Sequence, residues 1–342
     1  MCSFRCVVCL VAVAALGVAI AGCSNPGQGA PPGALEPVQA RSALPVPAFL
    51  RVVYDHLAPL APVHYNRNAL PKGLAYVSQF GATAVNAYNE NNKSNAAPVC
   101  SISGVIAVVG IGADKARNVW VPNGISKTIT KYAPNCGSPS TVLTSTHGQP
   151  AGIVFDSRSN AYVVDSFGPS QTPGNVAFFP AGSTMATRVL RDASIGGQAV
   201  GLAVHDGNVY LSYINTGNVG AVIEFPRGKM PGKIFTGITT SYPGGIVFDT
   251  NDNLVVVDIF AASASVYAPP YDGPATKTFP LHGGPVLCNF SKSETKLYCA
   301  DYKLGQVDMY AYPSGNYLYS WNNGLSASLA PEDVLLVPQA PG

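Results

Sequence analysis

The feature that most constrains this chain is a short unit that recurs with a period of about forty residues. Its clearest copy is residues 152–165, GIVFDSRSNAYVVD, in which two apolar runs flank a polar turn. Short polar side chains such as Asp156 and Asn160 favour a turn because they can bond to their own backbone. Continuous apolar runs, rather than alternating ones, indicate strands that are buried on both faces. The unit therefore predicts a buried β-hairpin.

The spacing of the copies indicates the architecture. They begin at residues 110, 152, 201, 245 and 287, so successive starts are 42, 49, 44 and 42 residues apart. A third strand follows each hairpin, and a fourth strand follows a turn of Pro, Gly or Asn. A repeat of this length with about four strands is typical of a blade of a β-propeller.

The two ends of the repeat region complete each other. Residues 74–77 (LAYV) match a second strand that lacks a first, and residues 334–337 (VLLV) match a first strand that lacks a second. If the last strand completes the first blade, the blades number six and no open edge remains between the first and last blades. We therefore expect an all-β, six-bladed propeller over residues 71–342, closed by its C-terminal strand.

The repeats also resemble a known family. Residues 245–258 (GIVFDTNDNLVVVD) are similar to the NHL repeat, whose pattern runs Pro-x-Gly-Ile/Val-Ala-Val-Asp and then Gly-Asn-Leu-Tyr-Val-Ala-Asp. The match covers roughly residues 72–338 and implies a six-bladed NHL-type propeller. Such propellers serve many unrelated functions, so the resemblance indicates neither a ligand nor a reaction.

The N-terminus indicates export. Arg5 precedes an apolar run over residues 7–21 that is too short to span a bilayer comfortably. The run ends in Ile-Ala-Gly-Cys at residues 20–23, which resembles the lipobox of bacterial lipoproteins; an ordinary secretory signal is the alternative. The resemblance implies that residues 1–22 are removed and that Cys23 is acylated, for example with palmitate. More than one acyl chain makes such anchoring stable.

The next segment links this anchor to the repeats. Ser24, rather than aspartate, follows Cys23, which by family resemblance favours the outer membrane in a cell that has one. Residues 24–46 are rich in Pro, Gly and Ala and lack aromatic residues, so they predict a flexible tether. Residues 47–60 carry apolar residues at near-helical spacing and read either as a short helix or as a partly ordered linker. Residues 23–70 are thus expected to form a lipid-anchored linker.

Four cysteines remain once the signal and the anchor are set aside, and an even number in an exported domain favours disulfides over metal binding. Three pairings are possible. A hairpin in which Phe290 faces Leu297 places Cys288 opposite Cys299, close enough to bridge. Cys100 and Cys136 then pair by default between the first two blades, and neither spacing resembles a zinc site.

Charge excludes one class of partner. Only 11% of the 342 residues are charged, the formal net charge is +2, and no basic stripe is visible. We therefore expect no nucleic-acid partner. The chain is expected to be a monomer whose partner is a protein, a glycan or a small molecule, with the membrane contacted through the N-terminal lipid.

The propeller topology predicts where a ligand would bind. Connections from second to third strands, and from fourth strands to the next blade, gather on one side, here called the mouth face; the turns inside the first hairpins lie on the opposite side, the hairpin face. The mouth face is expected to collect six candidate ligand-binding residues, His147, Asp165, Asp258, His282, Asp301 and Glu332. They could hold a divalent cation, as the resemblance to six-bladed lactonases and amidating lyases implies, or they could hold turns as part of the repeat. On the hairpin face, His205, Asp114, Asp156 and Asp249 are interpreted as turn residues.

No sequence motif indicates a reaction. The chain lacks Gly-x-Ser-x-Gly, His-Glu-x-x-His and a phosphate-cradling glycine motif. The one Ser-x-x-Lys, residues 293–296, lies in a hairpin turn, and residues 331–333 only approximate the Glu-Gly-Pro of lactonases. The leading hypothesis is a non-catalytic binding module anchored in the cell envelope. A metal-dependent hydrolase, lactonase or lyase with its site at the mouth is the competing one, and a purely structural envelope protein is the third. No cofactor is firmly implied, although a divalent cation is possible.

Overall fold

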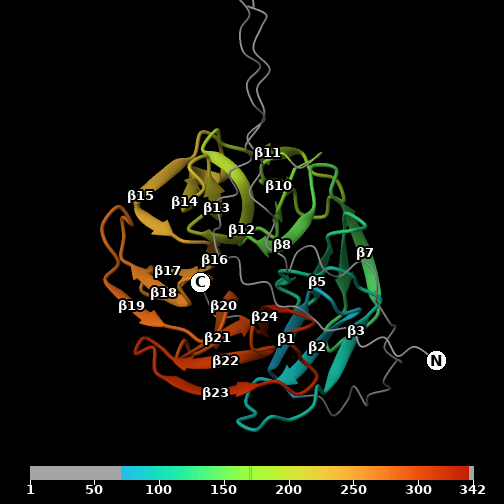
Figure 1. The fold of residues 1–342 in the computed structure, drawn as a ribbon. Coiled ribbons are helices and arrows are strands. Elements are labelled where there is room, and N and C mark those ends of the chain that lie inside the picture. Colours follow the sequence, from blue (N-terminus) through green and yellow to red (C-terminus); the bar gives the residue numbers. More distant parts are fainter. Residues whose placement is uncertain (1–70, 169, 171, 339–342) are drawn as a thin grey trace, which may run out of the picture. The chain divides into compact units, whose positions relative to one another are not determined.

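The computed structural model describes residues 71–168, 170 and 172–338. They form six four-stranded antiparallel sheets, which are arranged in a ring as the blades of a propeller (Figure 1). The predicted all-β, six-bladed fold is therefore confirmed. The signal segment, Cys23 and the linker up to residue 70 lie outside the described residues. Within the described part, no helix is long and apolar enough to cross a membrane.

The strands of each blade are given from the innermost to the outermost. Blade 1 consists of β24 (Pro331–Val337), β1 (Leu74–Gln79), β2 (Ala84–Asn89) and β3 (Cys100–Ser103). Blade 2 consists of β4 (Gly112–Ala113), β5 (Val119–Asn123), β6 (Thr128–Tyr132) and β7 (Pro139–Thr144). Blade 3 consists of β8 (Pro150–Phe155), β9 (Ala161–Asp165), β10 (Asn175–Phe179) and β11 (Arg188–Leu190).

The other three blades repeat this order. Blade 4 consists of β12 (Ile195–His205), β13 (Asn208–Asn215), β14 (Gly220–Phe225) and β15 (Lys233–Thr240), with the short 3-10 helix η3 (Pro226–Gly228) before β15. Blade 5 consists of β16 (Pro243–Phe248), β17 (Leu254–Asp258), β18 (Ser263–Tyr267) and β19 (Lys277–Pro280). Blade 6 consists of β20 (Pro285–Phe290), β21 (Lys296–Asp301), β22 (Gln306–Ala311) and β23 (Tyr317–Trp321).

The ring closes as expected, because the C-terminal strand β24 is the innermost strand of blade 1. It pairs antiparallel with β1, with Leu74 opposite Val337 and Val77 opposite Val334. Both Leu74 and Val337 therefore lie at the hairpin face, and β1 runs from there towards the mouth face. The described part of the chain therefore begins on the side opposite the mouth.

Both expected disulfides are present. In blade 6, Phe290 lies opposite Leu297 and Cys288 lies opposite Cys299, which is the predicted register. Cys288 and Cys299 are bonded, with a Cα–Cα distance of 4.1 Å. Cys100, at the start of β3, is bonded to Cys136, which lies between β6 and β7. This second bridge links blade 1 to blade 2.

The hydrophobic core lies between the blades, and each of the six interfaces between neighbouring blades has its own cluster of buried residues. Between blades 5 and 6, for example, Val255 and Val257 pack in the same cluster as Leu297 and Tyr310. Since every sheet is covered on both sides, its strands need apolar residues at consecutive positions. This packing explains the continuous apolar runs in the sequence.

The innermost strands approach one another closely around the axis, and glycine makes this approach possible. A Cβ atom on Gly201 of blade 4 would lie 2.6 Å from the carbonyl oxygen of Gly244 in blade 5. A Cβ atom on Gly244 would lie 2.6 Å from the carbonyl oxygen of Val286 in blade 6. Any larger residue at these two positions would push the blades apart.

The hairpin turns of blades 2, 3 and 5 share one arrangement, which confirms that their aspartates hold the turn. A carboxylate at the end of the first strand accepts hydrogen bonds from the backbone N–H groups two and four residues later, and from the side-chain amide of an asparagine four residues later. The pairs are Asp114 with Asn118, Asp156 with Asn160, and Asp249 with Asn253. The repeated unit recognised in the sequence is therefore a carboxylate-capped hairpin.

Candidate functional site

The six candidate residues all lie at the mouth face, but they do not converge into one cluster. His147 and His282 lie in connections between blades, Asp165, Asp258 and Asp301 end second strands, and Glu332 lies in the innermost strand β24. Among the described residues, the only group of three His, Cys, Asp or Glu side chains with donor atoms within 4.8 Å of one another lies on the hairpin face. The mouth residues are thus distributed around the ring.

Asp258 holds the mouth-face turns of blade 5. Its carboxylate accepts hydrogen bonds from the hydroxyl and the backbone N–H of Ser241, and from the backbone N–H groups of Tyr242, Phe260 and Ala261. These donors join the connection that enters the blade to the turn after β17. A carboxylate with this many donors has little capacity left for a ligand.

Asp301 holds the corresponding turn in blade 6, but only with one of its oxygens. Oδ1 accepts hydrogen bonds from the backbone N–H groups of Gly284 at 2.9 Å, Lys303 at 2.9 Å and Leu304 at 3.0 Å. Oδ2 is buried and has no hydrogen-bond partner among the described residues. Oδ1 of Asp301 therefore holds the turn, whereas Oδ2 accepts no hydrogen bond from the described residues.

A second acid, Asp308, lies near Asp301 and was not singled out from the sequence. It is 1% exposed, Oδ1 accepts a hydrogen bond from Gln306 at 2.7 Å, and the same oxygen lies 4.0 Å from Nδ1 of His282. Burial, and then the negative charge of Asp301, raise the pKa of Asp308 to about 7. The available signal was an acid at the centre of a strand that is otherwise apolar. Between blades 5 and 6, His282 and two acids thus form one polar group.

Asp165 lies between blades 2 and 3, close to the connection that carries His147. Asp165 is fully buried, and Oδ1 accepts a hydrogen bond from the hydroxyl of Ser145 at 2.8 Å, while Oδ2 has no partner in the described part of the chain. Burial raises the pKa of Asp165 to about 7. Burial, and then the positive charge of Arg191, lower the pKa of His147. At neutral pH the imidazole of His147 is therefore largely uncharged, and Asp165 is partly protonated.

Glu332 lies in the innermost strand β24 and is 1% exposed. Burial, and then the charge of Asp333, raise its pKa well above the ordinary range, and Oε1 has no hydrogen-bond partner among the described residues. Burial first, and then the proximity of Glu332, raise the pKa values of the Tyr242 and Tyr302 hydroxyls. The three side chains come from blades 1, 5 and 6, so they meet around the mouth.

Tyr242 extends this arrangement towards blades 3 and 4. Its hydroxyl donates a hydrogen bond to Oε1 of Gln198, and Nε2 of Gln198 donates to the hydroxyl of Ser166 at 2.9 Å. Sequence reasoning missed these residues. For Tyr242, the sequence offered one indication. It directly precedes Pro243, which begins a first strand, and this position lies at the mouth face. Together with Glu332 and Tyr302, they form what we call the polar belt: Ser166, Gln198, Tyr242, Tyr302 and Glu332.

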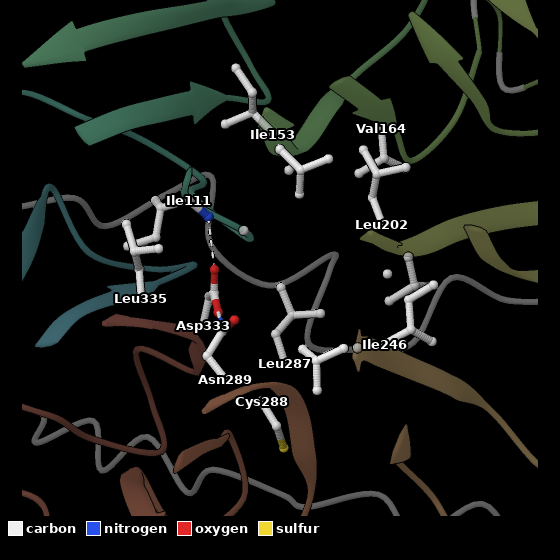
Figure 2. A pocket seen from close by; sticks show the side chains of 17 residues that line it. Ile111, Ile153, Val164, Leu202, Ile246, Leu287, Cys288, Asn289, Asp333 and Leu335 are labelled. Carbon is white, nitrogen blue, oxygen red and sulfur yellow. Dashed lines mark hydrogen bonds between the residues drawn. The ribbon is translucent and has the colours of Figure 1, made fainter. Parts of the chain in front are cut away.

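The cavity between the innermost strands, around the propeller axis, is small. The innermost strands enclose a cavity of about 70 Å³, which is lined mainly by aliphatic side chains and glycine (Figure 2). Its polar side chains are Asn289 and Asp333, and Asp333 accepts hydrogen bonds from Nδ2 of Asn289 at 3.2 Å and from the backbone N–H of Ile111 at 2.9 Å. Small-molecule sites usually have volumes of roughly 300–1,000 Å³. The cavity is therefore too small for an organic ligand.

Five large apolar side chains are exposed in the connections at the mouth face. Large hydrophobic side chains stand exposed in the second-to-third-strand connections of four blades and in the connection into blade 2. We call this set the apolar rim: Ile106, Ile125, Val219, Phe260 and Leu304. Leu304 and Phe260 are 53% and 51% exposed, although large apolar side chains are usually buried. Exposed apolar side chains contribute to interaction surfaces where they form a continuous patch.

A larger depression lies on the hairpin face, between blades 6 and 1. It has a volume of about 410 Å³ and includes Glu90, Ser293 and Lys296 in its lining. The hydroxyl of Ser293 bonds to that of Thr295 at 2.9 Å, and Nζ of Lys296 donates to the hydroxyl of Tyr319 at 3.2 Å. The serine and the lysine are thus engaged elsewhere, which agrees with the interpretation of Ser-x-x-Lys as a chance match.

Comparisons with known proteins show the fold. No protein-family model matches this chain, and no curated protein matches its sequence. A chain in the crystal structure of a nidogen/laminin complex is 16% identical, with a TM-score of 0.62 over 77% of this chain and 98% of that one. A functionally unknown protein from Desulfotomaculum acetoxidans DSM 771 is 11% identical, with a TM-score of 0.56 over 79% and 99%. At such identities the similarity concerns the propeller architecture alone.

Proposed function

We propose that this chain is an exported, lipid-anchored propeller of NHL-type repeats that binds a protein partner through its mouth face and catalyses no reaction. The observation that carries the proposal is the apolar rim, which lies on the same face as the polar belt. Exposed apolar side chains and a few polar groups on one face are both found in protein-binding surfaces.

The position of the chain ends supports the choice of face. The anchor at Cys23 and the linker up to residue 70 precede β1, which begins at the hairpin face. A tether that joins one face leaves the other free to meet a partner. Among the mouth residues, the partly exposed His147 and His282 are proposed to add polar contacts there. Asp165, Asp301 and Glu332 are buried and Asp258 holds turns, so these four are proposed to shape the face rather than to contact the partner.

Two observations favour binding over catalysis. Asp258 is occupied by turn hydrogen bonds, as is one oxygen of Asp301, and the axial cavity of about 70 Å³ is smaller than a substrate pocket. A large, shallow surface suits a protein better than a small substrate.

A pair of matched variants tests the binding face. Ile125→Asp with Leu304→Asp places two charges on the apolar rim, whereas Val142→Asp with Met185→Asp places two charges at apolar positions that are exposed elsewhere on the propeller. The wild type and both variants are cross-linked in cell envelopes, and the attached proteins are quantified by mass spectrometry. We expect the rim variant to lose a partner that the wild type and the control keep. Equal capture by all three proteins would contradict the proposal.

The anchor is tested separately. Cys23→Ala should abolish labelling by a radioactive fatty acid and release the propeller from the membrane fraction, because no acyl chain can then be attached. A variant that stays in the membrane fraction as the mature form would contradict the lipid anchor, while the binding proposal would still stand.

A further inference from the structure

The hairpin turn of blade 4 departs from the capped arrangement of the other blades. His205 occupies the position of the capping aspartate, and the turn is shortened to Asp206 and Gly207. Both turn residues adopt the left-handed conformation, with φ values of 49° and 76°. An imidazole cannot accept the set of backbone hydrogen bonds that a carboxylate accepts in the other turns. Turn capping therefore does not explain His205.

The contacts of His205 show that it does more than fill space. The side chain is 8% exposed, and its ring stacks on Phe248 at 4.2 Å between ring centroids and 8° between planes. Neither ring nitrogen has a hydrogen-bond partner within the described residues. Buried polar atoms in folded proteins nearly always have a partner, so an unpartnered imidazole points to a missing ligand.

Nε2 of His205 faces two carboxylates. It lies 3.1 Å from Oδ1 of Asp252 and 3.8 Å from Oδ2 of Asp206, although the angle of approach does not make a hydrogen bond. Asp252 comes from the neighbouring hairpin of blade 5, where the hydroxyl of Tyr271 donates to its backbone carbonyl at 2.8 Å. In the described part of the chain, no lysine or arginine forms an ion pair with either aspartate.

We propose that His205, Asp206 and Asp252 bind a divalent transition-metal ion of the zinc class on the hairpin face. Ligands of a tetrahedral zinc ion lie about 3.4 Å apart, and the two distances at Nε2 lie on either side of this value. Imidazole selects zinc, nickel or copper over magnesium and calcium, which prefer oxygen ligands. The two aspartates are largely exposed, so water can fill the remaining position.

The ion would connect blades 4 and 5, because two ligands come from one hairpin and one from the next. Ligation through Nε2 leaves the proton on Nδ1, which has no acceptor among the described residues. Zinc-bound histidines usually have such an acceptor, and its loss weakens binding by roughly 10- to 100-fold. We therefore expect a reversible site of moderate affinity whose occupation stabilises the propeller.

Calorimetric titration of the purified full-length protein with zinc chloride tests the site, and melting curves recorded with and without zinc provide a second readout. The test variant is Asp206→Asn with Asp252→Asn, which changes two exposed side chains and should fold. The matched control is Asp272→Asn, an exposed carboxylate 3.0 Å from Nζ of Lys233 in blade 4. His205→Asn provides an independent loss of the imidazole.

We expect one zinc ion to bind to the wild type and to the control, with a rise in melting temperature. Affinity should fall by roughly 10-fold or more in the double variant and in His205→Asn, because each removes ligands. Absence of zinc binding in the wild type, or binding that persists in the double variant, would overturn the proposal. A response to calcium chloride but not to zinc would overturn it as well, because the imidazole would then have no role.

Discussion

The hairpin face repeats one carboxylate arrangement in blades 2, 3 and 5, whereas Asp165 and Asp308 at the mouth face share no such arrangement. At Asp114 and Asp249, burial alone would raise the pKa, but hydrogen bonds from asparagine, from other side chains and from the backbone lower it overall. At the mouth face, Asp165 and Asp308 have fewer donors, and burial raises the pKa of each to about 7. Asp114 and Asp249 are therefore ionised at neutral pH, whereas Asp165 and Asp308 are partly protonated.

This difference separates the structural part of the repeat from the variable part. The capped hairpin recurs in blades 2, 3 and 5 because these turns need the same backbone hydrogen bonds, so their aspartates are explained by folding alone. The mouth acids have different neighbours in each blade, namely Ser145 for Asp165 and Gln306 for Asp308. A group that is buried without full hydrogen bonding destabilises the fold, and such groups often occur at functional sites.

The largest expected effect is on the pH dependence of stability at the mouth. The folded protein keeps the Asp165 proton up to about pH 7, whereas the unfolded chain loses it near pH 4, so the free energy of unfolding falls between these values. Asp165→Asn should remove up to about 4 kcal/mol of this fall. Urea unfolding at pH 4 and pH 8 measures it. A variant with the same pH dependence as the wild type would show that Asp165 is already ionised when folded.

A smaller effect is expected on the hairpin face. Asp249→Ala removes a 2% exposed carboxylate that also accepts a hydrogen bond of 2.6 Å from the hydroxyl of Tyr312 in blade 6. It should lower the free energy of unfolding by about 3 kcal/mol at pH 7. Because the folded pKa is depressed, this contribution is present above the unfolded pKa and is lost as the pH falls through the folded one.

Asp156→Ala is the comparison within the same face. Its carboxylate holds its own turn and is more exposed, so we expect a loss of about 1 kcal/mol by the same urea unfolding measurement. If the two variants were equally destabilised, the bond from Tyr312 would contribute nothing and the capped turn alone would account for the stability.

The smallest effect is expected at the apolar rim. Ile125→Asp with Leu304→Asp should change the free energy of unfolding by less than about 0.5 kcal/mol at each position, because both side chains are already exposed. A large drop in melting temperature would show that these side chains pack in the fold, and the rim would then not be a free surface.

The sequence predicted what the repeat determines. Period and apolar runs predicted the six blades, the closing strand and the capped turns, and the register of the blade 6 hairpin predicted the bridge between Cys288 and Cys299. These features depend on neighbours within one hairpin or on a fixed period. The polar belt and the contact between His205 and Asp252 depend on how loops of different blades approach one another, which no local pattern encodes.

The most direct test of the contrast between the faces is a carbon-13 NMR titration of the aspartate carboxyl groups, with single Asp→Asn variants used for assignment. The carboxyl groups of Asp114 and Asp249 should titrate below the ordinary aspartate range, and those of Asp165 and Asp308 should titrate near pH 7. If all four titrated together near pH 4, the mouth acids would be as well solvated or hydrogen-bonded as those of the hairpin face, and the distinction between the two faces would be wrong.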